Sequence, residues 1–114
     1  MTNCLFCKIV AQEIPSDKVL ENSDFLAFRD IDPKAPVHVL VIPKKHFEDI
    51  VELSKSDNEL SAGLMKFATE VAEVEKLKKG FRIVLNTGQD GGQSVQHVHA
   101  HVLGGRSLTW PPGY

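Results

Sequence analysis

The feature that most constrains the fold is a strict alternation of residue types between Ser94 and Leu103. At positions 97–102 the chain reads His-Val-His-Ala-His-Val, so histidine and apolar residues take turns. In a strand, successive side chains point to opposite faces, and β-branched valine favours that conformation. We therefore predict a strand whose apolar face enters a core, while three imidazoles form a row on the other face at steps of about 6.6 Å.

The rest of the pattern predicts an α+β fold, with a sheet covered by one long helix. Apolar residues at spacings of three and four over Leu60–Leu77 indicate that helix, with a capping box at Ser56–Glu59 and a C-terminal cap at Gly80. A short N-terminal helix is expected over Cys4–Glu13. Further strands are expected at Val19–Glu21, Phe25–Arg29, Val37–Ile42 and Phe81–Asn86.

Length and charge narrow the functional classes. The chain has 114 residues, 42% of them apolar and 25% charged, which fits one globular domain over residues 1–114. Thirteen basic against fifteen acidic side chains give a net charge of −2, which argues against a dedicated nucleic-acid or anionic-membrane binder.

The longest apolar stretch, Val37–Ile42, is too short to cross a bilayer. The N-terminus has neither a charged start nor an apolar signal core, so we expect a cytoplasmic protein.

The three alternating histidines admit two interpretations. On a helix, His97 and His101 would lie one turn apart, as in a zinc-binding His-x-x-x-His pair. On the predicted strand the outer rings lie about 13 Å apart, so one tetrahedral zinc, with nitrogens at about 2.1 Å, cannot reach all three. The row is therefore more typical of catalysis, since histidine near neutral pH is a competent nucleophile and proton carrier.

A glycine-rich turn precedes the histidines. Gly91 and Gly92 let the backbone approach a ligand closely, and the N–H groups of Gln93 and Ser94 could meet a phosphate. Together with the histidine row, this turn suggests attack at phosphorus.

Several motifs together resemble one protein family. His-Val-His-Ala-His-Val-Leu at 97–103 resembles the His-φ-His-φ-His-φφ signature of the histidine-triad family of nucleotide hydrolases and transferases. The resemblance covers almost the whole chain, and the ending, Leu-Gly-Gly-Arg at 103–106 with Trp-Pro-Pro-Gly at 110–113, is similar to the Hint branch, the nucleoside phosphoramidases. It implies a homodimer whose two five-stranded antiparallel sheets join into one. Each subunit would carry a nucleotide site near the partner's C-terminus.

The resemblance also implies catalytic roles for individual residues. His99 resembles the nucleophile, which attacks the α-phosphorus of a nucleotide and forms a nucleotidyl-histidine intermediate that water resolves. His97 and His101 would hydrogen-bond phosphate oxygens or orient His99. His38 resembles a fourth, supporting histidine, and Ser94 the serine that helps an amine leaving group depart.

The same resemblance, with the glycine-rich turn, indicates the substrate contacts. Asp30 would hold the ribose hydroxyls, and the base would lie in an apolar cleft, although plain core packing is the alternative for the apolar residues. The expected contacts are Asp30; Asn86, Gly92 and Gln93 near the phosphate; Leu5, Phe6, Ile9, Phe28 and Ile31 around the base; and Trp110.

Two cysteines three residues apart cannot supply a disulfide framework. Some bacterial members of the resembled family bind zinc with such a pair and two histidines. By that resemblance His46 and His97 would join Cys4 and Cys7 in a Cys₂His₂ site, whose four protein ligands would make the zinc structural. Two free thiols are the alternative. In either case the chemistry would require no cofactor.

The function expected from this resemblance is hydrolysis of the P–N bond of adenosine or guanosine 5′-phosphoramidates, and also of acyl adenylates. The substrate partner would thus be a purine nucleotide conjugate. One alternative is a dinucleoside polyphosphate hydrolase of the same fold. The other is a nucleotide-binding or interaction module that acts without catalysis.

Overall fold

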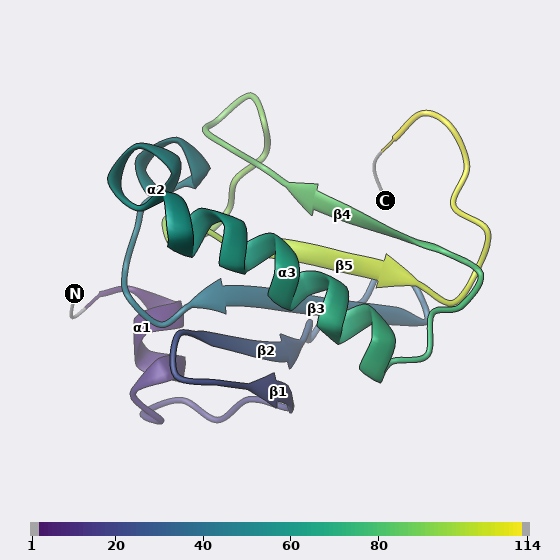
Figure 1. The fold of residues 1–114 in the computed structure, drawn as a ribbon, viewed down its shortest axis with the longest axis horizontal. Coiled ribbons are helices and arrows are strands. Elements are labelled where there is room, and N and C mark those ends of the chain that lie inside the picture. The colour runs from purple at the N-terminus through teal and green to yellow at the C-terminus, as the bar shows by residue number, and fades with distance from the viewer. Residues whose placement is uncertain (1–2, 113–114) are drawn as a thin grey trace.

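The computed structural model describes residues 3–112, and within them a five-stranded antiparallel sheet forms the centre of the molecule (Figure 1). Its strand order is β1-β2-β3-β5-β4, which leaves β1 and β4 at the edges. No helix of this part of the chain is long and apolar enough to cross a membrane. The elements are α1 (Leu5–Val10), β1 (Lys18–Glu21), β2 (Phe25–Arg29), β3 (Val37–Pro43), α2 (Ile50–Ser56), α3 (Asn58–Val74), β4 (Phe81–Leu85) and β5 (Ala100–Gly104).

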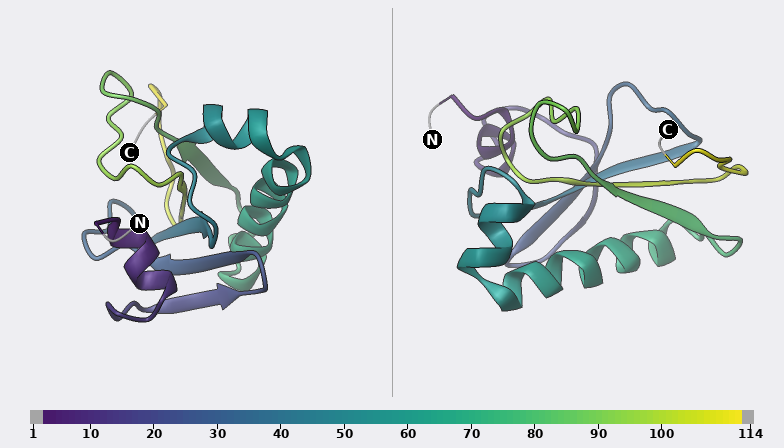
Figure 2. Two further views of the ribbon diagram at one scale, coloured as in Figure 1. Left: turned by 90° about the vertical axis from the view of Figure 1, so that its left-hand side faces the viewer. Right: turned by 90° about the horizontal axis from the view of Figure 1, so that it is seen from above.

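Alternate residues of the central strands enter two cores, one on each face of the sheet. On one face, α3 packs over the core that contains Val39 and Val41 of β3. On the opposite face, Phe6 of α1 packs in a smaller core with Leu40 and Ile42. Figure 2 shows α1 and α3 on opposite sides of the sheet. The α+β class, the five-stranded sheet and the covering helix are therefore confirmed.

The long helix α3 differs from its prediction at both ends. Its N-cap is Asp57, whose carboxylate accepts the N–H of Leu60 at 2.9 Å, because Ser56 belongs to α2, which the sequence did not indicate. At the other end Lys76 takes the left-handed conformation, with φ 60°, and the N–H of Leu77 donates to the carbonyl of Ala72 at 3.0 Å. This is a Schellman cap with lysine in the place of glycine. The helix therefore ends before the predicted cap at Gly80.

The predicted strand from Ser94 to Leu103 begins only at Ala100. Before that point the chain bonds to the last residue of β3 and to the segment that follows it. Nε2 of His97 donates to the carbonyl of Pro43 at 2.9 Å, and the N–H of Val98 donates to the carbonyl of Phe47 at 2.8 Å. The prediction of an evenly spaced row of three imidazoles is therefore wrong, because His97 lies outside the regular strand and its side chain turns away from the other two histidines. The apolar half of the pattern is confirmed, since positions 98, 100 and 102 all lie in the core beneath α3.

Candidate active site

His99 lies directly before β5, and the backbone fixes one of its ring nitrogens. Its Nδ1 lies 2.8 Å from the carbonyl oxygen of His97. A carbonyl oxygen only accepts, so Nδ1 must carry the ring proton. Burial lowers the pKa of His99, which favours the neutral ring. Nε2 therefore holds an unshared electron pair, as a nucleophile requires.

His101 belongs to a chain of hydrogen bonds that begins at a backbone amide. The N–H of Lys34 donates to Nδ1 of His38 at 3.0 Å, so the proton of that ring is on Nε2. That Nε2 lies 2.9 Å from Nδ1 of His101 and donates to it. His101 is left with its own proton on Nε2, and its ring centre lies 5.0 Å from that of His99. Two neighbouring rings thus carry a donor on His101 and a lone pair on His99.

Burial keeps both rings of this chain neutral. It lowers the pKa of His38, although the nearby Asp30 carboxylate opposes the shift. It also lowers the pKa of His101 to about 4, with a smaller contribution from the neighbouring His99 and His38. The direction of each hydrogen bond in the chain is therefore fixed near neutral pH. The sequence could not indicate this order, because its origin is the backbone amide of Lys34, which any residue other than proline could supply.

Asp30 lies beside the same chain. Its Oδ2 is 3.4 Å from Nε2 of His38, its Oδ1 accepts the N–H of Asp32 at 2.8 Å, and its side chain is 20% exposed. The ligand atoms of Asp30, His38 and His101 lie within 4.8 Å of one another, a spacing that a metal ion could also use. However, the facing nitrogens of the two rings already share a proton. We therefore describe the group as a hydrogen-bond chain with one partly open carboxylate.

An apolar wall lies against the histidines. The ring of Phe6 packs edge-on against His99, with centroids 5.1 Å apart, and against Phe28 at 5.5 Å. The structure thus brings Phe6 to His99, while the burial of Phe6 in the smaller core also fits plain packing. The five residues expected around the base divide into Phe6, Phe28 and Ile9, which are buried, and Leu5 and Ile31, which are exposed.

The glycine-rich turn does not offer one of the two backbone donors predicted for it, the N–H of Gln93. The N–H of Gln93 donates to the carbonyl of Gly88 at 3.0 Å, so this group is not free for a phosphate. The buried side chain of Gln93 accepts the N–H of Gly88 at 3.0 Å and donates to the carbonyls of Glu48 at 2.7 Å and Val95 at 3.0 Å. Gln93 is therefore a clamp that joins three backbone segments. Its side-chain amide already has internal partners, and its expected role as a substrate contact stays a prediction.

The two ends of the turn lie near the histidines. A Cβ atom at Gly91 would clash with the carbonyl oxygen of Thr87, and Gly92 has φ 79°, so the turn requires both glycines. Ser94 is exposed and lines a cavity of about 780 Å³ with Cys4, His46 and other residues. The half-buried Asn86 follows β4, whose last residue pairs with the first residue of β5, and this pairing places Asn86 next to His99.

The C-terminal segment runs beside the edge strand β4. Nη2 of Arg82 donates to the carbonyls of Leu108 at 3.2 Å and Thr109 at 3.0 Å. Trp110 follows with 84% of its surface exposed. Among residues 3–112, no hydrogen bond or ring contact joins Trp110 to a histidine of the same chain. The expected contact of Trp110 with a substrate therefore stays a prediction.

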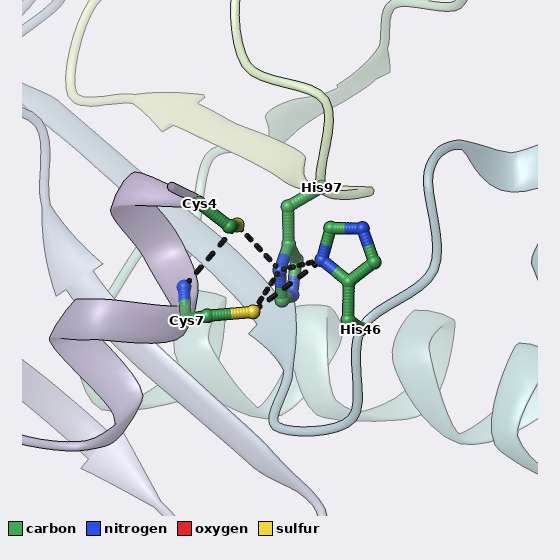
Figure 3. Close-up of side chains that lie close together, drawn as sticks. All are labelled: Cys4, Cys7, His46 and His97. Carbon is green, nitrogen blue, oxygen red and sulfur yellow. Dashed lines mark hydrogen bonds between the residues drawn. The ribbon is translucent and has the colours of Figure 1, made fainter. Parts of the chain in front are cut away.

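The side chain of His97 faces a second cluster, shown in Figure 3, which contains Cys4, Cys7 and His46. Its Nδ1 lies 3.4 Å from Sγ of Cys4, 3.6 Å from Sγ of Cys7 and 3.2 Å from Nδ1 of His46. Because Nε2 of His97 donates to a carbonyl, its Nδ1 directs a lone pair at the thiols. The structure therefore brings together all four residues predicted as zinc ligands. It also directs the His97 side chain away from the expected phosphate contact.

The chemistry of these donors fits zinc. The four ligand atoms lie within 4.8 Å of one another, and two sulfurs with two imidazole nitrogens form a set that zinc binds tetrahedrally. Burial lowers the pKa of His97 to about 4, which keeps its ring neutral and able to coordinate. Burial and the adjacent Cys4 raise the pKa of the Cys7 thiol to about 11, a shift that a bound cation would reverse.

Fold and site together define a class of α+β proteins in which an open antiparallel sheet presents neutral, oriented histidines for nucleophilic chemistry. Comparison with known families identifies that class more closely. The HIT domain family matches residues 11–108, and the chain belongs to this family, the histidine-triad proteins.

Individual relatives agree with the family assignment. The chain is 49% identical over 109 residues to a HIT-like protein of Synechococcus elongatus, with 96% of each chain covered. Its structure is similar to that of a HIT family hydrolase from Legionella pneumophila, with a TM-score of 0.93, 51% identity, and 97% and 100% of the two chains covered. A histidine triad nucleotide-binding protein from Candida albicans aligns with a TM-score of 0.82 and 30% identity, over 98% and 85% of the two chains.

Proposed function

We propose that this chain hydrolyses purine nucleoside 5′-phosphoramidates to a nucleoside monophosphate and an amine. The observation that carries this proposal is the pair formed by His99, with a lone pair on Nε2, and His101, with a proton on Nε2. One ring can attack phosphorus while the other donates to a phosphate oxygen. Similarity to a family hydrolase and to a nucleotide-binding relative supports both the reaction type and the kind of substrate.

In the first step, Nε2 of His99 forms a bond to the α-phosphorus while the bond from phosphorus to the amine breaks. The amine must gain a proton as it departs, and Ser94, together with His101, is the proposed source. The His99 ring then carries a positive charge, because its proton stays on Nδ1, where it is donated to the carbonyl of His97. In the second step, water forms the new P–O bond and gives up a proton that restores the Ser94–His101 donor. The P–Nε2 bond breaks, and the ring returns to its neutral form.

The proposed nucleotide lies along the histidine side of the sheet. The partly open carboxylate of Asp30 would accept the ribose hydroxyls, and Asn86 would contact the phosphate beside His99. The base would lie toward the apolar wall that contains Phe6. The exposed Ile31 and Leu5 would border it.

We also propose one structural zinc ion at the cluster formed by Cys4, Cys7, His46 and His97. Four protein ligands leave no open coordination position, so zinc would stabilise the fold and the hydrolysis would require no cofactor. Free thiols of this kind are typical of a reducing compartment, in agreement with the expected cytoplasmic location.

The proposal includes a homodimer that forms through β4. This strand lies at an edge of the sheet, where unpaired backbone groups can extend the sheet with a second copy. The C-terminal segment is anchored on the same strand through Arg82. Dimerisation there would give the exposed Trp110 a site in the partner subunit.

One substrate comparison tests the proposed function against its two alternatives. Adenosine 5′-phosphoramidate and diadenosine tetraphosphate are supplied at equal concentration, and AMP release is followed. We expect the phosphoramidate to have the larger kcat/KM by at least about tenfold, a difference of about 1.4 kcal/mol in transition-state stabilisation. Preference for the tetraphosphate would favour the dinucleoside polyphosphate hydrolase. Binding without turnover of either compound would favour a module that acts by interaction.

A further inference from the structure

His97 joins two sites through three different atoms. Its Nδ1 faces the thiols of Cys4 and Cys7, its Nε2 donates to the carbonyl of Pro43, and its own carbonyl oxygen accepts Nδ1–H of His99. The residue is completely buried. A movement of the His97 ring would therefore be transmitted over two residues to the group that sets the tautomer of His99.

We propose that His97 is a positioning residue that makes the reactivity of His99 depend on metal occupancy of the cluster of Cys4, Cys7, His46 and His97. The proposal rests on the proposed function, in which His99 is the nucleophile. A metal ion on Nδ1 of His97 would hold the ring, and with it the carbonyl that keeps the His99 proton away from Nε2.

The local backbone makes this dependence strong. His97 precedes β5, so no strand pairing holds its carbonyl in place. The neighbouring anchors are single hydrogen bonds, from Nε2 of His97 to Pro43 and from the N–H of Val98 to Phe47. Metal coordination of the His97 ring would add a further anchor to this residue, whose carbonyl accepts the Nδ1 proton of His99. Loss of the metal would leave that carbonyl held only by bonds that can rearrange.

Helix α1 gives the cluster a second connection to the nucleophile. The ring of Phe6, between the two cysteines in sequence, packs edge-on against His97 at 5.9 Å and against His99 at 5.1 Å. Cys4 also caps the helix, because its Sγ accepts the N–H of Cys7 at 3.3 Å. Metal release would loosen the segment that holds Phe6 against both histidines.

The expected consequence is a change of tautomer. If the carbonyl of His97 moves away, the proton of His99 can occupy Nε2, the atom that must attack phosphorus. Asp30 lies beside His38 near the start of β3, whereas His46 of the cluster follows the end of that strand, so we expect the proposed substrate contact of Asp30 to be unaffected. Zinc removal should therefore lower kcat by about tenfold or more, while KM stays within about twofold.

The test follows ¹⁵N NMR signals of the His99 ring together with kcat and KM. Three wild-type samples are compared: zinc-loaded, stripped by a chelator, and reloaded with zinc. The loaded and reloaded samples should show a protonated Nδ1 and a bare Nε2, and the stripped sample a mixed tautomer with reduced kcat. The signals are assigned by their loss in His99→Gln.

Two variants distinguish an effect of metal occupancy on His99 from an effect of a weakened helix α1. Cys4→Ser removes a metal ligand but keeps an oxygen that can cap α1, so it should behave like the stripped wild type and should not respond to a chelator. Lys8→Gly is the matched control, because it weakens α1 and leaves all four ligands in place. Because zinc on Cys4 and Cys7 still holds α1 in place, this zinc-loaded variant should keep the loaded tautomer and the wild-type kcat.

Several results would overturn the proposal. It fails if the stripped protein and Cys4→Ser keep a protonated Nδ1 and full kcat, or if Lys8→Gly reproduces their effect. It also fails if the chain binds no zinc when zinc is supplied, or if both metal-free forms unfold, since the cluster would then act on folding alone. A loaded wild type that cleaves no phosphoramidate would remove the proposed function instead, and the tautomer signals would still decide the coupling.

Discussion

Nδ1 of His99 lies 2.8 Å from the carbonyl oxygen of His97, and this single contact determines which nitrogen of the ring can act as a nucleophile. A histidine on a strand has two equivalent choices of tautomer unless a neighbour removes one. Here the carbonyl of His97 excludes the tautomer with the proton on Nε2. The lone pair on Nε2 that the proposed mechanism requires is therefore present in the structure without a ligand.

Acid should destabilise the fold through His101. Its folded-state pKa is lowered from 6.5 to about 4, so the folded ring is neutral while the unfolded ring takes a proton. Stability is thus unaffected above pH 6.5 and falls as the pH drops toward 4, by up to about 1.4 kcal/mol per pH unit for this group. Urea unfolding across this range should show this slope of unfolding free energy against pH. The measurement is made in Cys4→Ser, so that metal release at low pH does not contribute. His101→Gln should reduce the slope, and an unchanged slope would contradict the buried neutral ring.

Ser94→Ala should slow P–N hydrolysis by about 10²–10⁴-fold, because the amine can leave only with a proton. An acyl adenylate releases a carboxylate and does not need that donor, so its hydrolysis should change far less. Both rates are measured on the same preparation. Ser107→Ala, at another exposed serine outside the site, is the control and should leave both unchanged. Equal slowing of the two substrates would mean that Ser94 acts only on the shape of the turn.

Gln93→Ala should lower the free energy of unfolding by about 1–3 kcal/mol, because its buried side chain makes partly buried hydrogen bonds to the backbone of Gly88, Glu48 and Val95. It should also lower kcat, since the turn carries Ser94. The matched control is Gln96→Ala, at an exposed glutamine three residues away whose one hydrogen bond is 3.4 Å long. Chemical denaturation of both variants measures the difference. Similar stability of the two would show that the clamp contributes nothing.

The cluster of Cys4, Cys7, His46 and His97 should hold close to one zinc per chain after purification without a chelator. Stripping the metal should lower the Tm, because zinc binds the folded site and not the separated ligands of the unfolded chain. Metal analysis and thermal unfolding of wild type and Cys4→Ser check this. Less than about a tenth of an equivalent after zinc is supplied would favour free thiols.

Much of the fold was predictable, because β2, β3 and the apolar stripe of α3 carry strong local patterns. The errors occur where tertiary contacts override the pattern. Alternation at 94–103 indicated a single strand, but the strand begins only at Ala100. Before it, the His97 side chain bonds to the carbonyl of Pro43. The end of α3 was misplaced because lysine, and not glycine, takes the left-handed position.

The residues of the candidate site could be predicted from the sequence, but the hydrogen bonds between their side chains and the backbone could not. The pattern identified the histidines, the cysteine pair and Ser94. It could not show that Gln93 is a clamp or that a backbone amide orders the protons of His38 and His101. Backbone donors and acceptors are the same at nearly every residue, so a sequence carries little information about which of them will meet a side chain.

His99 is only 4% exposed, which is more buried than its place on the predicted strand suggested. His99→Ala would open a cavity beside Phe6, so His99→Gln is the better variant. It should stay folded and bind nucleotide, while kcat falls by about 10³-fold or more, as expected when a covalent nucleophile is lost. Circular dichroism and nucleotide titration supply the controls for folding and binding.

The most direct test of the central claim is to trap the intermediate. Protein is mixed rapidly with excess adenosine 5′-phosphoramidate, quenched in alkaline denaturant, and analysed by intact and peptide mass spectrometry. The account predicts one adenylyl group on His99, which forms and decays fast enough to support kcat and is absent in His99→Gln. An adduct on another residue, or normal turnover by the folded His99→Gln variant, would contradict it.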